Sequence, residues 1–132
     1  MLLVGAPTSD GRDDTDVGSA FLYALDDLSE PLLELVAQTP IGREQLGRAV
    51  TIGEDVIALS APGSNPGLGG NGTVAGRVLT FSRETGEELD EFSANEGSLD
   101  DYFGVKIDVS GRDLAVGAPG HDEERGAIFL FE

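Results

Sequence analysis

The feature that most constrains this chain is an internal repeat with a spacing of 57 residues. An apolar residue followed by glycine stands at Leu46-Gly47 and again at Phe103-Gly104. Farther along each copy, Leu59-Ser60-Ala61-Pro62 recurs as Val116-Gly117-Ala118-Pro119, and an earlier partial copy ends in Gly5-Ala6-Pro7. Self-similarity at a fixed spacing predicts a fold built from stacked copies of one supersecondary unit.

Each copy has the alternating pattern of β-strands. Val105, Ile107 and Val109 are separated by charged residues, and a period of two is typical of a strand. A turn at Ser110-Gly111-Arg112 then leads into a partner strand, which predicts an antiparallel hairpin. Glycine-led third strands are expected at Gly18–Tyr23, Gly76–Phe81 and Gly126–Phe131, and fourth strands near Leu32–Ala37 and Glu87–Ser93.

The third strands are apolar on both faces. In the first of them, Phe21 and Tyr23 point to one face, while Ala20 and Leu22 point to the other. Such a strand is buried on both sides when its sheet lies between two other layers. Four short antiparallel strands in each unit, stacked on their copies, predict an all-β fold made of four-stranded antiparallel blades of a β-propeller. Small residues before the proline would let neighbouring sheets approach closely.

Counted by strands, the chain contains about two and a half blades. We expect three strands in a partial first blade (residues 1–45), four in a complete second blade (46–101) and three in a partial third blade (102–132). This is an incomplete propeller, because closed propellers have about 4–8 blades. Two explanations stay open, namely further blades in a longer chain or self-association of several copies through apolar end faces.

The composition is strongly acidic. There are 25 acidic and 8 basic residues, so the formal net charge is -17, and nucleic acid or an anionic membrane is a poor partner. No apolar stretch approaches the roughly 20 residues that a membrane-spanning helix needs, so no membrane insertion is expected. With no cysteine in the chain, disulfides and thiolate metal sites are excluded, but the redox compartment stays undetermined.

Lysine is nearly absent from this acidic chain. Lys106 is the only lysine among the eight basic residues. An acidic, lysine-poor surface favours a halophilic protein, because concentrated salt screens the self-repulsion of the negative charges. A GC-rich coding bias would also replace lysine with arginine, so both explanations stay open.

These repeated residues resemble the FG-GAP repeat, which forms the propeller blades of integrin alpha subunits. Phe103-Gly104 is similar to the opening of the motif, while Gly5-Ala6-Pro7 and Gly117-Ala118-Pro119 match its second half. The resemblance implies an extracellular or cell-surface protein that acts in cell adhesion as a non-catalytic interaction module. Its ligand would be a protein or a glycan. The alternative is that the blades are an accessory propeller portion of a larger secreted hydrolase or lyase.

In a propeller, function resides in the loops between strands rather than in the sheets. Three inter-strand loops are therefore expected to lie on one common face and to meet the ligand. They are Thr8–Val17, Gly63–Ala75 and Gly120–Arg125.

The sequence also contains one candidate metal site. Family members that bind calcium do so in a long acidic loop, but here the corresponding joins are the short Gly53-Glu54-Asp55 and Ser110-Gly111-Arg112. These joins cannot supply the six to eight oxygens that calcium prefers, so the family site is not carried over. In the first loop, however, Asp10, Asp14 and Asp16 are spaced to reach one hard cation such as calcium. The alternative is a solvated acidic turn, and no other cofactor is expected.

Three further motifs give little indication of function. Gly67–Gly72 matches the GxGxxG pattern, but a strand rather than a helix follows it, so no dinucleotide site is expected. Asn71-Gly72-Thr73 is a glycosylation sequon. His121, the single histidine, stands beside Asp122 and is expected to be an exposed bystander rather than a catalytic residue.

Overall fold

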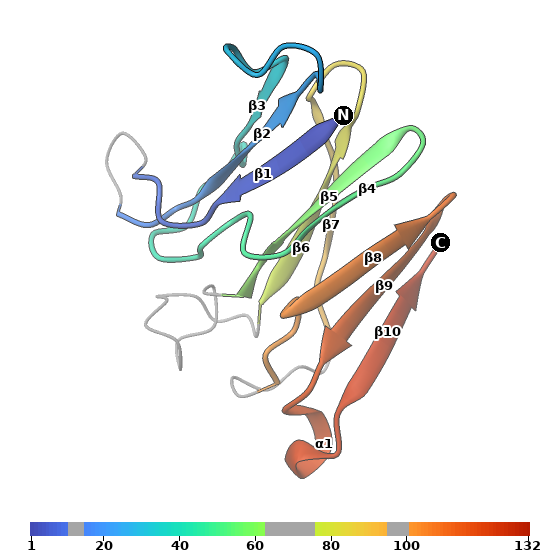
Figure 1. The fold of residues 1–132 in the computed structure, drawn as a ribbon. Helices are drawn as coiled ribbons and strands as arrows, with labels where there is room; N and C mark the ends of the chain where they lie inside the picture. The colour runs from blue at the N-terminus through green and yellow to red at the C-terminus, as the bar shows by residue number, and fades with distance from the viewer. Residues whose placement is uncertain (11–14, 63–75, 95–100) are drawn as a thin grey trace.

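The computed structural model describes residues 1–10, 15–62, 76–94 and 101–132. These residues form three antiparallel sheets and one short helical turn (Figure 1). The first sheet contains β1 (Leu2–Ala6), β2 (Ser19–Tyr23) and β3 (Leu33–Leu35); the second contains β4 (Val50–Ile52), β5 (Val56–Ala61), β6 (Arg77–Ser82) and β7 (Glu88–Phe92); the third contains β8 (Lys106–Ser110), β9 (Asp113–Ala118) and β10 (Ala127–Phe131). The turn is α1 (His121–Glu124). The predicted all-β class is therefore confirmed.

Each sheet is a simple meander in which strands consecutive in the chain are hydrogen-bonded neighbours. The tightest connection joins β8 to β9. Ser110 pairs with Asp113, so only Gly111 and Arg112 lie between the paired residues, one residue fewer than the sequence suggested. The observed sheets have three, four and three strands, whereas the blade boundaries at residues 45 and 101 stay predictions.

The three sheets lie face to face in chain order, with the second sheet between the other two (Figure 1). A first core cluster joins the first and second sheets. Its fully buried members include Leu22, Leu35, Leu59 and Phe81. A second cluster joins the second and third sheets and is made of Ala58, Val78, Phe103, Leu114, Val116 and Ala118. Each large apolar side chain buried in this way contributes about 1.5–3 kcal/mol to folding.

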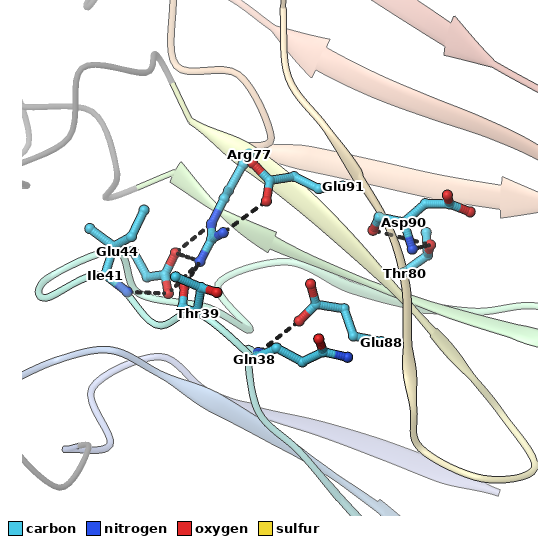
Figure 2. Close-up of polar contacts among 9 residues, drawn as sticks. All are labelled: Gln38, Thr39, Ile41, Glu44, Arg77, Thr80, Glu88, Asp90 and Glu91. Carbon is cyan, nitrogen blue, oxygen red and sulfur yellow. Dashed lines mark hydrogen bonds and ion pairs between the residues drawn. The ribbon is translucent and has the colours of Figure 1, made fainter.

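The second sheet is buried on both faces, as the alternating pattern requires. On β6, Leu79 and Phe81 pack against the first sheet, whereas Val78 packs against the third. Thr80 is buried with its hydroxyl satisfied, because it accepts the Asp90 N–H at 3.2 Å and donates to the Asp90 carbonyl at 3.4 Å (Figure 2). Burial on both faces was therefore correctly predicted for β6.

The third sheet is an end layer of the described stack, and one of its faces is open. Ile128 and Leu130 on β10 are each 75% exposed, because no other layer of the described chain covers their face. The first sheet also has an uncovered face, on which Leu2 and Val4 are 39% and 41% exposed. A strand that is apolar on both sides is thus fully buried only in the middle layer.

Candidate binding edge

Strands β1, β5 and β9 all end at one edge of the stacked sheets, and β2, β6 and β10 begin there (Figure 1). We call this edge the loop edge. Of the three loops predicted to lie there, Gly120–Arg125 is described throughout, and Thr8–Val17 is described except for residues 11–14. The loop Gly63–Ala75 lies outside the described residues.

The sheets approach each other closely at the loop edge, and glycine makes this approach possible. Gly47 has a φ of +89°, and a Cβ placed on it would overlap the carbonyl oxygen of Ser19 in the first sheet. Gly76 has a φ of +106°, and a Cβ there would overlap the carbonyl oxygen of Phe103. A side chain at either position would force the sheets apart in addition to straining the backbone. Neither glycine precedes a proline, so the sequence did not predict these two; of the small residues it did single out, Gly5 lies in such a contact, because a Cβ there would overlap the carbonyl oxygen of Gly47.

Backbone hydrogen bonds join the end of the first loop to the segment that enters the second sheet. Gly18 and Leu46 form an isolated parallel bridge. The accompanying bonds run from the N–H groups of Arg43, Gln45 and Leu46 to the carbonyls of Thr15, Asp16 and Val17, at 2.8, 3.0 and 3.0 Å. The first loop is therefore held against the second sheet by main-chain contacts that do not depend on side-chain identity.

A buried ion pair lies beside this junction (Figure 2). Arg77 donates from Nε to Oε2 of Glu44 at 2.7 Å and from Nη2 to Oε1 at 2.9 Å. The same guanidinium reaches Glu91 at 3.0 Å and the carbonyl of Thr39 at 2.9 Å. Glu44 also accepts the N–H of Ile41 at 2.9 Å, and its side chain is fully buried. The pair therefore fixes the start of β6 to the segment that precedes β4.

Burial raises the pKa of Glu44, while the Ile41 N–H and the Arg77 guanidinium act in the opposite direction. Loss of hydration disfavours the charged carboxylate, and the bidentate arginine offsets part of that cost. Reasoning from the sequence missed this pair because charged side chains are ordinarily exposed. The one available signal was an arginine at the start of an otherwise apolar strand.

A second buried carboxylate lies at the equivalent position of the next repeat. Asp101 follows Glu44 at the repeat spacing and is also buried. Its Oδ2 lies 2.7 Å from Nδ1 of His121, and its carbonyl accepts the Gly120 N–H at 3.1 Å. The imidazole also meets the edge of the Phe129 ring at a centroid distance of 5.5 Å. His121 therefore contacts Asp101 and is partly buried, whereas the sequence suggested an exposed histidine beside Asp122.

The helical turn α1 that follows has an unusual backbone. Asp122, Glu123 and Glu124 have φ values of +53°, +54° and +67°, respectively. Three consecutive non-glycine residues in the left-handed region are strained. The turn reverses the chain between β9 and β10 and places its acidic side chains at the loop edge.

Two of the three predicted metal ligands are described. The Asp16 N–H donates to Oδ1 of Asp10 at 3.1 Å, so the first loop closes on itself through this carboxylate. Asp14 lies outside the described residues, and the three-residue site stays a prediction. Within the part of the chain that the structure describes, no group of three or more metal-ligating side chains comes together. The GxGxxG match and the sequon also lie outside that part.

Stacked, repeat-related sheets with glycine-mediated contacts define this chain as an all-β repeat protein. Residues 87–131, which span β7 to β10, match the family model described as the FG-GAP repeat. This part of the chain therefore contains an FG-GAP repeat, in agreement with the resemblance in its sequence. FG-GAP repeats are generally found in extracellular or cell-surface proteins. No curated protein matches the chain, and no helix among the described residues is long and apolar enough to cross a membrane.

Proposed function

We propose that this protein is a non-catalytic interaction module, in which the three sheets are blades of an incomplete β-propeller. Its loop edge would bind a protein or glycan ligand outside the cell or at its surface. The observation that carries the proposal is that β1, β5 and β9 end at the same edge of a rigid stack of sheets (Figure 1). Binding residues in such folds concentrate on loops held by a rigid framework.

The chemistry of the described loop edge favours polar recognition. The loop Gly120–Arg125 combines His121, three consecutive acids and Arg125. The Arg125 side chain is 77% exposed, and among the described residues its one ion-pair contact is a long one, 3.4 Å to Asp122. This arginine can therefore donate to a carboxylate or to sugar hydroxyls at little cost in lost internal contacts. Net negative charge elsewhere would steer the module toward neutral or basic ligands.

The proposal is tested by screening the labelled 132-residue chain against a glycan array and a panel of extracellular matrix proteins. Arg125→Ala at the loop edge is compared with Arg112→Ala, which removes the same side chain from the β8–β9 turn at the opposite edge. We expect Arg125→Ala to weaken binding at least tenfold and Arg112→Ala to leave it unchanged. No binding to either panel, or equal loss in the two variants, would contradict the proposal.

The alternative, an accessory propeller of a larger secreted hydrolase or lyase, depends on residues beyond this chain and stays a prediction. Calcium at Asp10, Asp14 and Asp16 also stays a prediction. Neither is needed for the binding role proposed here, which rests on the common edge at which β1, β5 and β9 end (Figure 1).

A further inference from the structure

Within the described residues, the first and third sheets each have an apolar face that no other sheet covers. The outer face of the third sheet carries Ile128 and Leu130 on β10, each 75% exposed. On the neighbouring β9, Ala115 pairs with Leu130 and Gly117 pairs with Ile128. On the outer face of the first sheet, Val4 pairs with Phe21 and Leu2 pairs with Tyr23, and all four side chains are partly or largely exposed. The outer face of the third sheet therefore combines small residues on β9 with two aliphatic side chains on β10. The outer face of the first sheet carries two aromatic rings on β2.

The repeat shows which contact the outer face of the third sheet is built to make. A glycine stands directly before each of the strands β2, β6 and β10. The second and fourth residues after this glycine face the next sheet in the chain. Ala20 and Leu22 occupy these positions in the first sheet and pack on the second. Val78 occupies one in the second sheet and packs on the third. Ile128 and Leu130 are the equivalents in the third sheet, so their face corresponds to one that elsewhere packs on a following sheet.

The outer face of the first sheet has the complementary pattern. The third and fifth residues after the leading glycine face the preceding sheet. Phe81 is one of these and is fully buried against the first sheet. Phe129 and Phe131 are the equivalents in the third sheet and pack on the second. Phe21 and Tyr23 occupy these positions in the first sheet, which has no preceding sheet among the described residues.

Strands β5 and β9, which pair with β6 and β10, show the same correspondence between the two outer faces and the observed contact. In the observed contact between the second and third sheets, Ala58 and Ser60 on β5 occupy the positions directed at the third sheet, and both are fully buried. Ala115 and Gly117 are their repeat equivalents on β9. Small residues at these positions leave room for aromatic rings such as Phe129 of the facing sheet. The same small-against-large arrangement is available between the outer face of the third sheet in one molecule and the outer face of the first sheet in a second copy.

We propose that copies of this chain stack head to tail, with the outer face of the third sheet of one molecule on the outer face of the first sheet of the next. Such a contact is heterologous, because the two surfaces differ, and it leaves a free face at each end of the assembly. The net charge of -17 on each copy opposes association in dilute buffer. In about 1 M salt the Debye length falls to about 3 Å, so the apolar contact can prevail.

The test measures molar mass by light scattering after gel filtration, across a concentration series in about 1 M and about 0.1 M salt. We expect the wild-type chain to exceed its monomer mass of 13.7 kDa in molar salt and to grow with concentration. Leu130→Glu should block one face and Val4→Glu the other. Leu25→Glu, which changes a 67% exposed leucine in the turn between β2 and β3, is the matched control and should behave as wild type. Circular dichroism checks that each variant folds, and Ile128→Glu replaces Leu130→Glu if it does not.

Mixing the two blocked variants distinguishes head-to-tail stacking from a symmetric dimer. Each variant alone should remain a monomer, whereas the mixture should form a one-to-one pair that grows no further, because only one intact contact is left. A wild-type chain that is monomeric at every concentration and salt level would overturn the proposal. So would a blocked variant that still dimerises alone, since that result indicates a contact between like faces. Ligand binding by the loop edge is measured separately on the monomeric variants, so the two proposals can fail independently.

Discussion

The contact between the first and second sheets includes a buried ion pair at its edge, whereas the contact between the second and third sheets is lined with aromatic rings. In the first contact, Arg77 holds Glu44 at 2.7 Å. In the second, Phe92 and Phe131 lie 4.8 Å apart between ring centroids, and Phe103 meets Phe129 edge-on at 5.3 Å. Two neighbouring contacts in one repeat protein therefore use different chemistry.

The comparison of these two contacts shows that the repeat determines the backbone path but not the chemistry of the side chains. Leu46 and Phe103 stand at equivalent positions, both are fully buried, and the glycines that follow have φ values of +89° and +90°. The backbone path is thus the same, while the side chains differ in size. Aromatic pairs add about 0.5–1.5 kcal/mol beyond burial, whereas desolvation offsets much of the gain from a buried ion pair. We infer that the aromatic contact contributes more to stability and that the ion pair mainly fixes geometry.

The largest effect is expected from Phe103→Ala. Removing this buried ring should lower the free energy of unfolding by about 3–5 kcal/mol, because a cavity forms and two ring contacts are lost. Phe103→Leu, which introduces the residue found at the equivalent position 46, should cost less than about 1.5 kcal/mol. Urea denaturation in molar salt measures both. Equal costs for the two variants would contradict this expectation, because they would show that an aliphatic side chain replaces none of the contribution of the ring.

Arg77→Met is expected to cost about 3 kcal/mol, because it leaves Glu44 buried without its cation. Adding Glu44→Gln should restore at least half of this loss, since glutamine keeps an acceptor for the Ile41 N–H and carries no charge. The same denaturation assay applies. If the double variant is as unstable as Arg77→Met alone, the buried charge is not the cause of the loss.

Raising the salt concentration should stabilise the whole chain without changing the relative contributions of the two contacts between sheets. Raising the salt from about 0.1 M to about 1 M screens the surface acids, and we expect the melting temperature of the wild-type chain to rise by several degrees. The buried Arg77–Glu44 pair is screened much less than surface charges, so the cost of Arg77→Met should change little. An unchanged wild-type midpoint would count against adaptation to concentrated salt.

The smallest effect concerns pH. The pKa of Glu44 is raised in the folded state, so the folded protein holds this proton to a higher pH than the unfolded chain. The contribution of the protonated group is fully present below the unfolded value of about 4.5 and is lost as pH rises through the folded pKa. Melting temperatures between about pH 4 and pH 7 should therefore fall for wild type relative to Glu44→Gln. If the melting temperature of wild type instead rises relative to that of Glu44→Gln over this range, the effect of Arg77 on the pKa of Glu44 outweighs the effect of burial.

Much of the fold could be predicted from the sequence because strand alternation and the repeat are local signals. The third and fourth strands lie where the pattern placed them. Exposure of Ile128 does not follow from alternation, which reports that both faces are apolar but not how many layers are present; it agrees instead with the strand count, which predicted an incomplete stack with apolar end faces. The layer count depends on neighbours outside the strand.

The candidate site was less predictable for a related reason. The position of the loops follows from strand order, but the partners of Glu44 and Asp101 depend on which distant residues the fold brings near. Arg77 lies 33 positions from Glu44, and His121 lies 20 positions from Asp101. A comparison of the two copies could have flagged an acid at the same position in each. It could not have identified one partner as an arginine on a strand and the other as a histidine on a turn.

The central claim is that the sheets stack through repeat-equivalent faces, and aromatic nuclear Overhauser contacts test it most directly. The account predicts a strong contact between the rings of Phe92 on β7 and Phe131 on β10, in a monomeric variant such as Val4→Glu. Intact strand-to-strand contacts within each sheet, combined with no contact between these two rings, would contradict the stacked arrangement.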